Sequence, residues 1–215
     1  MSAPSPREVR AVIFDLDRTL VDLQTYTDYA AALRDLTVLV GEQQGADVPE
    51  ADWDAPTLST MAVLVSLSGD PRWHDASSAV AAHERAAIAQ SVAMPGLESL
   101  EVALGRLPRA VVTLLPEDVA REVLGHHGVD IEVIVGRDPD IPAKPSGAGL
   151  VVAATRLGVP VSATVMIGDS SWDHAAAVDV GAAFIGVPVS ASAFGPDVPV
   201  AAGLLAAVDA ALRGG

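Results

Sequence analysis

Short apolar runs recur along the chain and alternate with stretches in which apolar residues have helical spacing. The runs are rich in Val and Ile and lack strict polar–apolar alternation, which is typical of parallel strands covered on both faces. They predict strands at 10–15, 109–113, 132–135, 164–167 and 182–187. The helical spacing predicts helices at 97–106, 117–126, 147–157, 174–180 and near 202–212. Strands alternating with helices of this length favour an α/β fold with a doubly wound parallel sheet.

The stretch from residue 23 to residue 93 interrupts this alternation, because it contains no strand pattern. Helical patterns occur at 25–40, 58–67 and 76–92, separated by two loops rich in Gly, Pro and Asp. We therefore expect residues 22–93 to form a helical insertion, and residues 1–21 and 94–215 to form the α/β domain. Since the insertion directly follows the first strand, it is placed to cover the carboxyl edge of the sheet as a lid.

The first strand ends in two carboxylates. The segment VIFDLDRTLVD (residues 12–22) runs from a buried-strand pattern directly into Asp15 and Asp17. Ligands of open α/β sheets bind outside the carboxyl ends of the strands, and residues two positions apart on an extended chain share a side. Carboxylates this close repel each other, and Mg²⁺, which prefers oxygen ligands, relieves that repulsion. An acidic helix N-cap is the alternative interpretation of this segment alone.

A second acidic cluster follows the fourth predicted strand. In VMIGDSSWDHAAA (residues 165–177), Asp169 ends the strand and Asp173 lies four residues later. This spacing brings the two carboxylates to one side if a helical turn connects them; alternatively, Asp173 is the N-cap of the next helix. With Asp15 and Asp17, the chain has four carboxylates at the ends of two predicted strands. Helix capping alone does not readily account for so many.

Two further polar residues are candidates for binding an anion. Thr113 ends the strand AVVT, where its hydroxyl and the following backbone N–H are suited to a phosphate oxygen. Lys144 is the single lysine among thirteen basic residues and precedes a predicted helix. A lone lysine in an arginine-using chain favours a role for a compact, rotatable ammonium group.

Composition narrows the classes of partner. The formal net charge of −15 disfavours nucleic acid and anionic membrane surfaces. The chain has no cysteine, which excludes disulfides and thiolate catalysis, and no apolar run long enough to span a bilayer. The N-terminal segment MSAPSPRE lacks the apolar core of a signal peptide. These features fit a cytoplasmic protein, which we expect to be a monomer or a homodimer.

The order DxDxT, strand-end Thr, Lys-Pro and GDxxxD resembles the haloacid dehalogenase superfamily of aspartyl-phosphate phosphohydrolases. The resemblance covers the whole α/β domain, and the helical insertion lies where that family places its C1 cap on a Rossmann-like core. The closest resemblance is to members of the phosphoglycolate phosphatase and beta-phosphoglucomutase types. It implies a Mg²⁺-dependent phosphatase of a small phosphorylated metabolite, working through an aspartyl-phosphate intermediate.

The resemblance also implies roles for particular residues. Asp15 is the expected nucleophile and Asp17 the expected general acid and base. The expected metal ligands are the Asp15 carboxylate, the Asp17 carbonyl and Asp169, with Asp173 ligating or orienting nearby. Thr113 and Lys144 are expected to stabilise charge on the transferring phosphoryl group.

Two positions depart from the family pattern. Arg18 stands where glycine is usual and is a candidate for a further contact to the phosphate or the cap. Leu114 stands where many relatives have asparagine. These departures bear on substrate binding more than on reaction class. A phosphomutase, in which the aspartyl phosphate returns to a sugar, and a non-catalytic binding module are the alternative functions. A carbon–halogen dehalogenase is disfavoured, because that branch has no acid at the position of Asp17.

Overall fold

The computed structural model of this chain describes residues 8–41, 51–187 and 193–213. The expected N-terminal tail and most of the first loop of the insertion lie outside these residues. Five strands form one parallel sheet in the order β5-β4-β1-β6-β7. They are β1 (Ala11–Phe14), β4 (Arg109–Val112), β5 (Val133–Val135), β6 (Thr164–Gly168) and β7 (Ala183–Gly186). The predicted doubly wound parallel sheet is confirmed.

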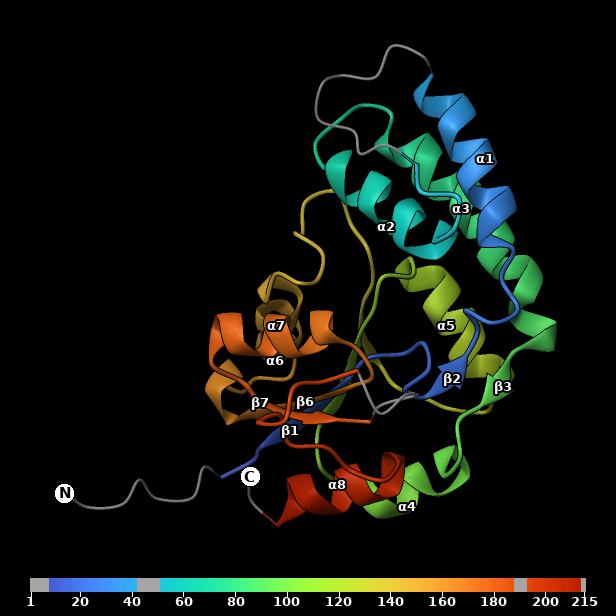
Figure 1. Cartoon of the computed structure of the whole chain (residues 1–215). Coiled ribbons are helices and arrows are strands. Elements are labelled where there is room, and N and C mark those ends of the chain that lie inside the picture. The colour runs from blue at the N-terminus through green and yellow to red at the C-terminus, as the bar shows by residue number, and fades with distance from the viewer. Residues whose placement is uncertain (1–7, 42–50, 188–192, 214–215) are drawn as a thin grey trace.

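Helices cover both faces of the sheet, as the continuous apolar strands require. Val12 and Phe14 of β1 pack on one face against α4 (Leu100–Leu104), α5 (Glu117–His126) and α8 (Leu204–Leu212). Ile13 points to the opposite face and packs with α6 (Ala148–Arg156) and α7 (Ser171–Val180). Figure 1 shows α6 and α7 on one side of the strands and α4 and α8 on the other.

The helical insertion consists of α1 (Tyr29–Val40), α2 (Pro56–Ser66) and α3 (Trp73–Ala87), which group together apart from the sheet (Figure 1). These helices enclose an apolar cluster of their own, to which Leu36, Leu64 and Trp73 contribute. At its base, β2 (Val21–Asp22) pairs with β3 (Val92–Ala93) in an antiparallel ribbon. The ribbon therefore joins the two ends of the insertion at the point where the chain leaves and re-enters the α/β part.

Several element boundaries differ from those predicted. α7 begins at Ser171 rather than 174, because Ser170 caps it: the Ser170 hydroxyl accepts from the Asp173 N–H, and the Asp173 carboxylate accepts from the Ser170 N–H. α1 begins only at Tyr29, after the N-cap Asp28. The last predicted helix of the insertion ends at Ala87 and gives way to a 3-10 turn and β3. Strands of two residues are too short to leave a periodic pattern.

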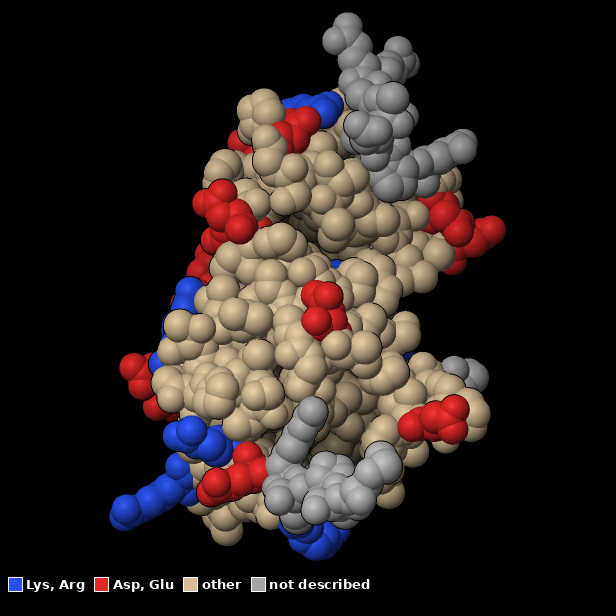
Figure 2. Space-filling model, turned by 90° about the vertical axis from the view of Figure 1, so that its left-hand side faces the viewer, with Lys and Arg blue, Asp and Glu red and all other residues tan. Residues whose placement is uncertain are grey.

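The remaining elements are 3-10 helices: η1 (Ile88–Gln90), η2 (Leu97–Ser99) and η3 (Val161–Ala163). None of the helices in the described ranges is both long and apolar enough to cross a membrane. In Figure 2 most charged side chains of the face shown lie near its edges, although acidic atoms also lie near its centre.

Candidate active site

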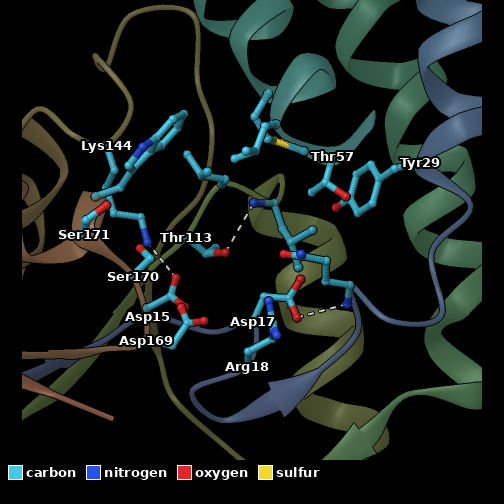
Figure 3. Close-up of a pocket in the computed structure, with 16 residues that line it drawn as sticks. Asp15, Asp17, Arg18, Tyr29, Thr57, Thr113, Lys144, Asp169, Ser170 and Ser171 are labelled. Carbon is cyan, nitrogen blue, oxygen red and sulfur yellow. Dashed lines mark hydrogen bonds and ion pairs between the residues drawn. The ribbon is translucent and has the colours of Figure 1, made fainter. Parts of the chain in front are cut away.

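A cavity of about 250 Å³ lies between the carboxyl edge of the sheet and the helical insertion. Figure 3 shows its lining, with residues from the strand ends below and from the insertion above. Most of the residues singled out in the sequence line this cavity, namely Asp15, Asp17, Arg18, Thr113, Leu114, Lys144 and Asp169. Asp173 lies behind this lining and is fully buried. The fold thus gathers residues that are up to 154 positions apart in the sequence (169 − 15).

Asp15 follows β1 and is continuous with the sheet, because its N–H donates to the Ile167 carbonyl at 2.8 Å. Its side chain is 8% exposed. One carboxylate oxygen accepts from Lys144 Nζ at 2.6 Å, and the other accepts from the Thr19 hydroxyl at 3.3 Å. Burial raises the pKa of Asp15 to about 7, although Lys144 acts in the opposite direction.

Lys144 bridges two buried carboxylates. Its Nζ lies 2.6 Å from Asp15 Oδ1 and 2.6 Å from Asp173 Oδ1. Burial by itself lowers the pKa of Lys144, but the two carboxylates outweigh burial and raise it, so the ammonium group stays charged. A fixed positive charge therefore lies directly beside Asp15.

Asp173 has both carboxylate oxygens occupied. Oδ1 accepts from Lys144, and Oδ2 accepts from the Ser170 hydroxyl at 2.6 Å and the Ser170 N–H at 3.1 Å. Asp173 is thus the third residue of α7 and not its N-cap, which corrects that alternative. Gly168 makes room for it, because a Cβ there would lie 2.6 Å from the Asp173 side chain. Asp173 is placed to orient Lys144.

Asp17 is half-buried, and its carboxylate is held by the loop that follows it. Its Oδ1 accepts from the backbone N–H groups of Leu23 and Gln24, both at 3.0 Å. Burial raises the pKa of Asp17 to about 7 in spite of these two hydrogen bonds. A carboxyl group with this pKa exchanges a proton readily near neutral pH.

Three carboxylates form a group suited to a hard cation. Asp15, Asp169 and Asp173 offer oxygens that all lie within 4.8 Å of one another. The pKa of Asp169 is raised to about 7 by burial and by Asp173, which indicates negative charge that the protein itself does not fully compensate. Oxygen ligands of this kind suit Mg²⁺. Asp15 and Asp169 line the cavity, whereas Asp173 lies behind its lining, so Asp15 and Asp169 are the better ligands. The Asp17 side chain is outside this group.

Arg18 has a left-handed backbone conformation, with φ of +62°. This conformation is costly for residues with a Cβ and explains why glycine is usual at this position of the family pattern. The side chain lines the cavity, and its charge counteracts the rise in the pKa of Asp169. It makes no hydrogen bond or ion pair with any residue in the described ranges. Its guanidinium is therefore available to a ligand.

Thr113 and Leu114 follow β4 at the edge of the cavity. The Thr113 hydroxyl accepts from the Leu115 N–H at 3.2 Å, which leaves its own proton free for an acceptor in the cavity. The Leu114 side chain packs against the apolar cluster of the insertion. Leu114 thus forms part of the contact between the α/β part and the insertion, instead of the polar contact that asparagine would make.

Several residues of the cavity were not predicted from the sequence. Tyr29, Thr57 and Met61 line it from α1 and α2 of the insertion, and Trp172 lines it from α7. A buried ion pair, in which Arg137 donates to Glu84 at 2.8 and 3.0 Å, was not predicted either. The helical period shows that α1 and α2 have an apolar face, but not which residues of that face meet the sheet edge. The only signal in the sequence was the charged pair Arg137-Asp138, which follows the predicted strand 132–135.

Comparisons with known proteins agree with this architecture. A model of the haloacid dehalogenase-like hydrolase family matches residues 9–181. None of the curated proteins compared with this chain matches it. A hydrolase from Pseudomonas syringae is 24% identical, with a TM-score of 0.70, over 93% of this chain and 96% of that one.

Two further solved structures have the same fold. A putative phosphoglycolate phosphatase from Lactobacillus plantarum is 20% identical, with a TM-score of 0.59, over 83% of this chain and 86% of that one. A mutant of CbbY from Rhodobacter sphaeroides, in complex with xylulose-1,5-bisphosphate, is 18% identical, with a TM-score of 0.69, over 92% and 95%. Because the family model spans most of the sequence and the motif residues meet in one cavity, the chain belongs to the haloacid dehalogenase-like hydrolases.

Proposed function

We propose that this hydrolase is a Mg²⁺-dependent phosphatase that acts on a small phosphorylated metabolite through an aspartyl phosphate on Asp15. The observation that carries the proposal is the Asp15–Lys144 contact of 2.6 Å inside the cavity, with Asp17 two residues away. A nucleophile, a fixed cation and an acid with a pKa of about 7 are thereby available at one place.

In the first half-reaction, a carboxylate oxygen of Asp15 attacks phosphorus, and the bond between phosphorus and the leaving-group oxygen breaks. Asp17 gives its proton to that oxygen, so the leaving group departs as a neutral alcohol. Lys144 and the Thr113 hydroxyl contact the phosphoryl oxygens, where negative charge is spread in the transition state. The two backbone N–H groups on Asp17 Oδ1 fix the orientation of this acid.

In the second half-reaction, ionised Asp17 takes a proton from water as the water oxygen attacks the aspartyl phosphate. The bond between phosphorus and Asp15 breaks, which returns the Asp15 carboxylate and releases inorganic phosphate. Both steps use the same proton site in opposite directions, for which a pKa near the working pH is suited.

Asp15 and Asp169 would hold the cation, and the Asp17 carbonyl is the further ligand that the family resemblance implies. When bound, Mg²⁺ would neutralise charge on the phosphoryl group and on the two carboxylates. Asp173 contributes by keeping Lys144 beside Asp15.

The helical insertion (residues 22–93) is proposed to act as a cap that excludes water and selects the leaving group. Tyr29, Thr57 and Met61 support this role, because they reach the cavity from that side. The chain is further proposed to work in the cytoplasm, as a monomer or homodimer, without nucleic acid or membrane partners.

The test is phosphate release from p-nitrophenyl phosphate, measured with Mg²⁺ and with EDTA, in the parent and in Asp15→Asn. We expect Mg²⁺-dependent turnover in the parent and a loss of about 10⁴-fold or more in the variant, since the nucleophile is gone. Circular dichroism should show that Asp15→Asn remains folded. Near-parental turnover in a folded Asp15→Asn protein would remove the covalent mechanism.

A further inference from the structure

The cavity has a charged side and an uncharged side. The sheet edge supplies its carboxylates and cations, whereas the insertion supplies uncharged residues, namely Gln24, Tyr29, Thr57, Leu58 and Met61. In Figure 3, Lys144, Asp15 and Asp169 lie together, away from Thr57 and Tyr29. The phosphoryl group belongs on the charged side, so the leaving group of the substrate faces the insertion.

The insertion offers no cation to this cavity. Its only basic side chains with a permanent charge are three arginines, Arg34, Arg72 and Arg85. Arg34 is exposed, and Arg72 pairs with Asp70 at 2.7 Å. Arg85 pairs with Glu122 and Asp118 on α5. None of the three lines the cavity, and the undescribed residues 42–50 contain no Lys, Arg or His.

The remaining cations of the cavity lie on the phosphoryl side. Lys144 is held between Asp15 and Asp173. Arg18 lies beside Asp169, whose negative charge it partly offsets, and in Figure 3 it is on the far side of Asp17 from Thr57. A second anionic group on the substrate would therefore meet a wall without a cation, inside a chain of net charge −15.

One acidic side chain of the insertion does come near the cavity, but its charge is already compensated. Glu84 is fully buried and makes a bidentate ion pair with Arg137. It also accepts from the Tyr29 hydroxyl at 3.3 Å. Burial and Glu84 raise the pKa of Tyr29 well above its ordinary value, so the phenol is uncharged. With its proton directed to Glu84, the Tyr29 oxygen has lone pairs left to accept a hydrogen bond.

Apolar groups complete this side of the cavity. Met61 belongs to the apolar cluster of the insertion, and Leu114 and Trp172 pack against that cluster. The cavity volume of about 250 Å³ is below the roughly 300–1,000 Å³ of sites for drug-sized ligands. The leaving group is therefore small.

We propose that the substrate is a small monophosphate with an uncharged leaving group, which contacts Met61, Leu114 and Trp172 and donates a hydroxyl to Tyr29. This inference rests on the proposed phosphatase function. It separates this chain from a phosphatase for phosphoglycolate, whose leaving group carries a carboxylate, and from one for a bisphosphate.

The test compares kcat/KM for three substrates that differ at one group: ethyl phosphate, 2-hydroxyethyl phosphate and phosphoglycolate. We expect 2-hydroxyethyl phosphate to exceed phosphoglycolate by at least about tenfold, because the carboxylate finds no cation. Equal or better turnover of phosphoglycolate, or of a sugar bisphosphate, would overturn the inference while leaving the phosphatase intact. No Mg²⁺-dependent turnover of any substrate, p-nitrophenyl phosphate included, would overturn the proposed function and this inference together.

Two variants locate the cause of the selectivity. Thr57 is half-buried in the first turn of α2, where Thr57→Lys adds a cation and Thr57→Gln adds similar length without charge. Thr57→Lys should shift the kcat/KM ratio toward phosphoglycolate by about tenfold or more relative to Thr57→Gln. The same ratio in both variants would show that the missing cation is not what excludes the carboxylate.

Tyr29→Phe tests the hydroxyl contact. It removes one neutral hydrogen bond, so the ratio of kcat/KM for 2-hydroxyethyl phosphate over ethyl phosphate should fall by about two- to tenfold. An unchanged ratio in a folded variant would remove Tyr29 from the recognition of the leaving group.

Discussion

The two sides of the cavity stabilise charge in different ways. On the sheet side, Asp15 is buried, Asp17 and Asp169 are half-buried, and the pKa of each is raised to about 7, so their charges are only partly compensated by the protein. On the insertion side, Glu84 is fully buried but has a bidentate partner in Arg137. The carboxylates of the sheet side thus repel one another, and a bound cation would relieve that repulsion. The buried carboxylate of the insertion side is already neutralised by its partner.

The carboxylates of the sheet side are thus free to react, whereas the buried ion pair of the insertion side holds two parts of the protein together. Arg137 comes from the loop after β5, and besides Glu84 it contacts the Ser77 hydroxyl, the Ser77 carbonyl and the Leu114 carbonyl. All five of its N–H donors are thereby used within the protein. The buried charge of the insertion therefore fastens α3 to the α/β part and takes no part in binding a substrate.

The largest effect should come from breaking that attachment. Glu84→Ala leaves Arg137 buried without its carboxylate, and loss of one partner of a buried pair typically costs about 3–5 kcal/mol of unfolding free energy. Urea denaturation measures it. Glu117→Ala is the control, because Glu117 is paired with Arg121 and Arg156 at the surface, where such pairs contribute about 0.3–0.5 kcal/mol each. A loss for Glu84→Ala as small as that of the control would contradict the attachment role.

Removing the fixed cation on the sheet side comes next. Lys144→Met should lower kcat by about 10²–10³-fold, the usual cost of losing one preorganised charge-stabilising group. Lys144→Arg keeps the charge but not the compact geometry between Asp15 and Asp173, so its residual activity should also be low. Steady-state kinetics with Mg²⁺ provide the measurement. Lys144 would lose its assigned role if Lys144→Met retained more than about a third of the parental kcat.

A smaller effect concerns pH and the cation. Asp15, Asp17 and Asp169 have folded pKa values of about 7, above the ordinary 3.8, so the folded protein holds protons that the unfolded chain releases. Without a divalent cation, stability from these groups is greatest at low pH, falls between about pH 4 and pH 7, and is constant above. The Mg²⁺-induced rise in Tm should therefore be larger at about pH 8 than at about pH 5.

Melting curves with excess Mg²⁺ and with EDTA test this difference directly. Asp169→Asn should reduce the Mg²⁺-induced rise in Tm at the higher pH, because one ligand of the cation is lost. An identical rise at both pH values, or an identical rise in parent and variant, would remove these carboxylates from the cation site.

The smallest expected effect is that of Arg18→Gly. The left-handed conformation at φ +62° costs an arginine about 1–2 kcal/mol, so glycine should increase stability by up to about 1 kcal/mol. Loss of the guanidinium should raise KM by less than about tenfold, with kcat little changed. Arg18→Asn separates the two effects, since asparagine tolerates this conformation but carries no charge. Abolished turnover in both variants, with the fold intact, would show a catalytic duty for Arg18.

The sequence was sufficient to predict the parallel sheet and the residues at its carboxyl edge that line the cavity. Continuous Val- and Ile-rich runs identify parallel strands, and a residue that ends such a strand must lie at the carboxyl edge of the sheet. Asp15, Thr113 and Asp169 could therefore be placed together from local pattern alone, although they come from three different strands. The contacts of Lys144 with Asp15 and Asp173 were harder to predict, because Lys144 lies in a loop, and a loop has no hydrophobic period that indicates where a side chain points.

The insertion side depended on tertiary structure. Helical spacing marks apolar faces on α1 and α2, but it does not distinguish residues that pack within the insertion from those that turn toward the sheet. Leu64 is in the insertion's apolar cluster and does not reach this cavity, whereas Met61, one turn earlier on the same helix, belongs to both. Likewise, Glu84 and Arg137 are 53 residues apart, and no local pattern pairs them. Local pattern determines which strand a residue ends, whereas the packing of helices against one another depends on surfaces that exist only once the chain has folded.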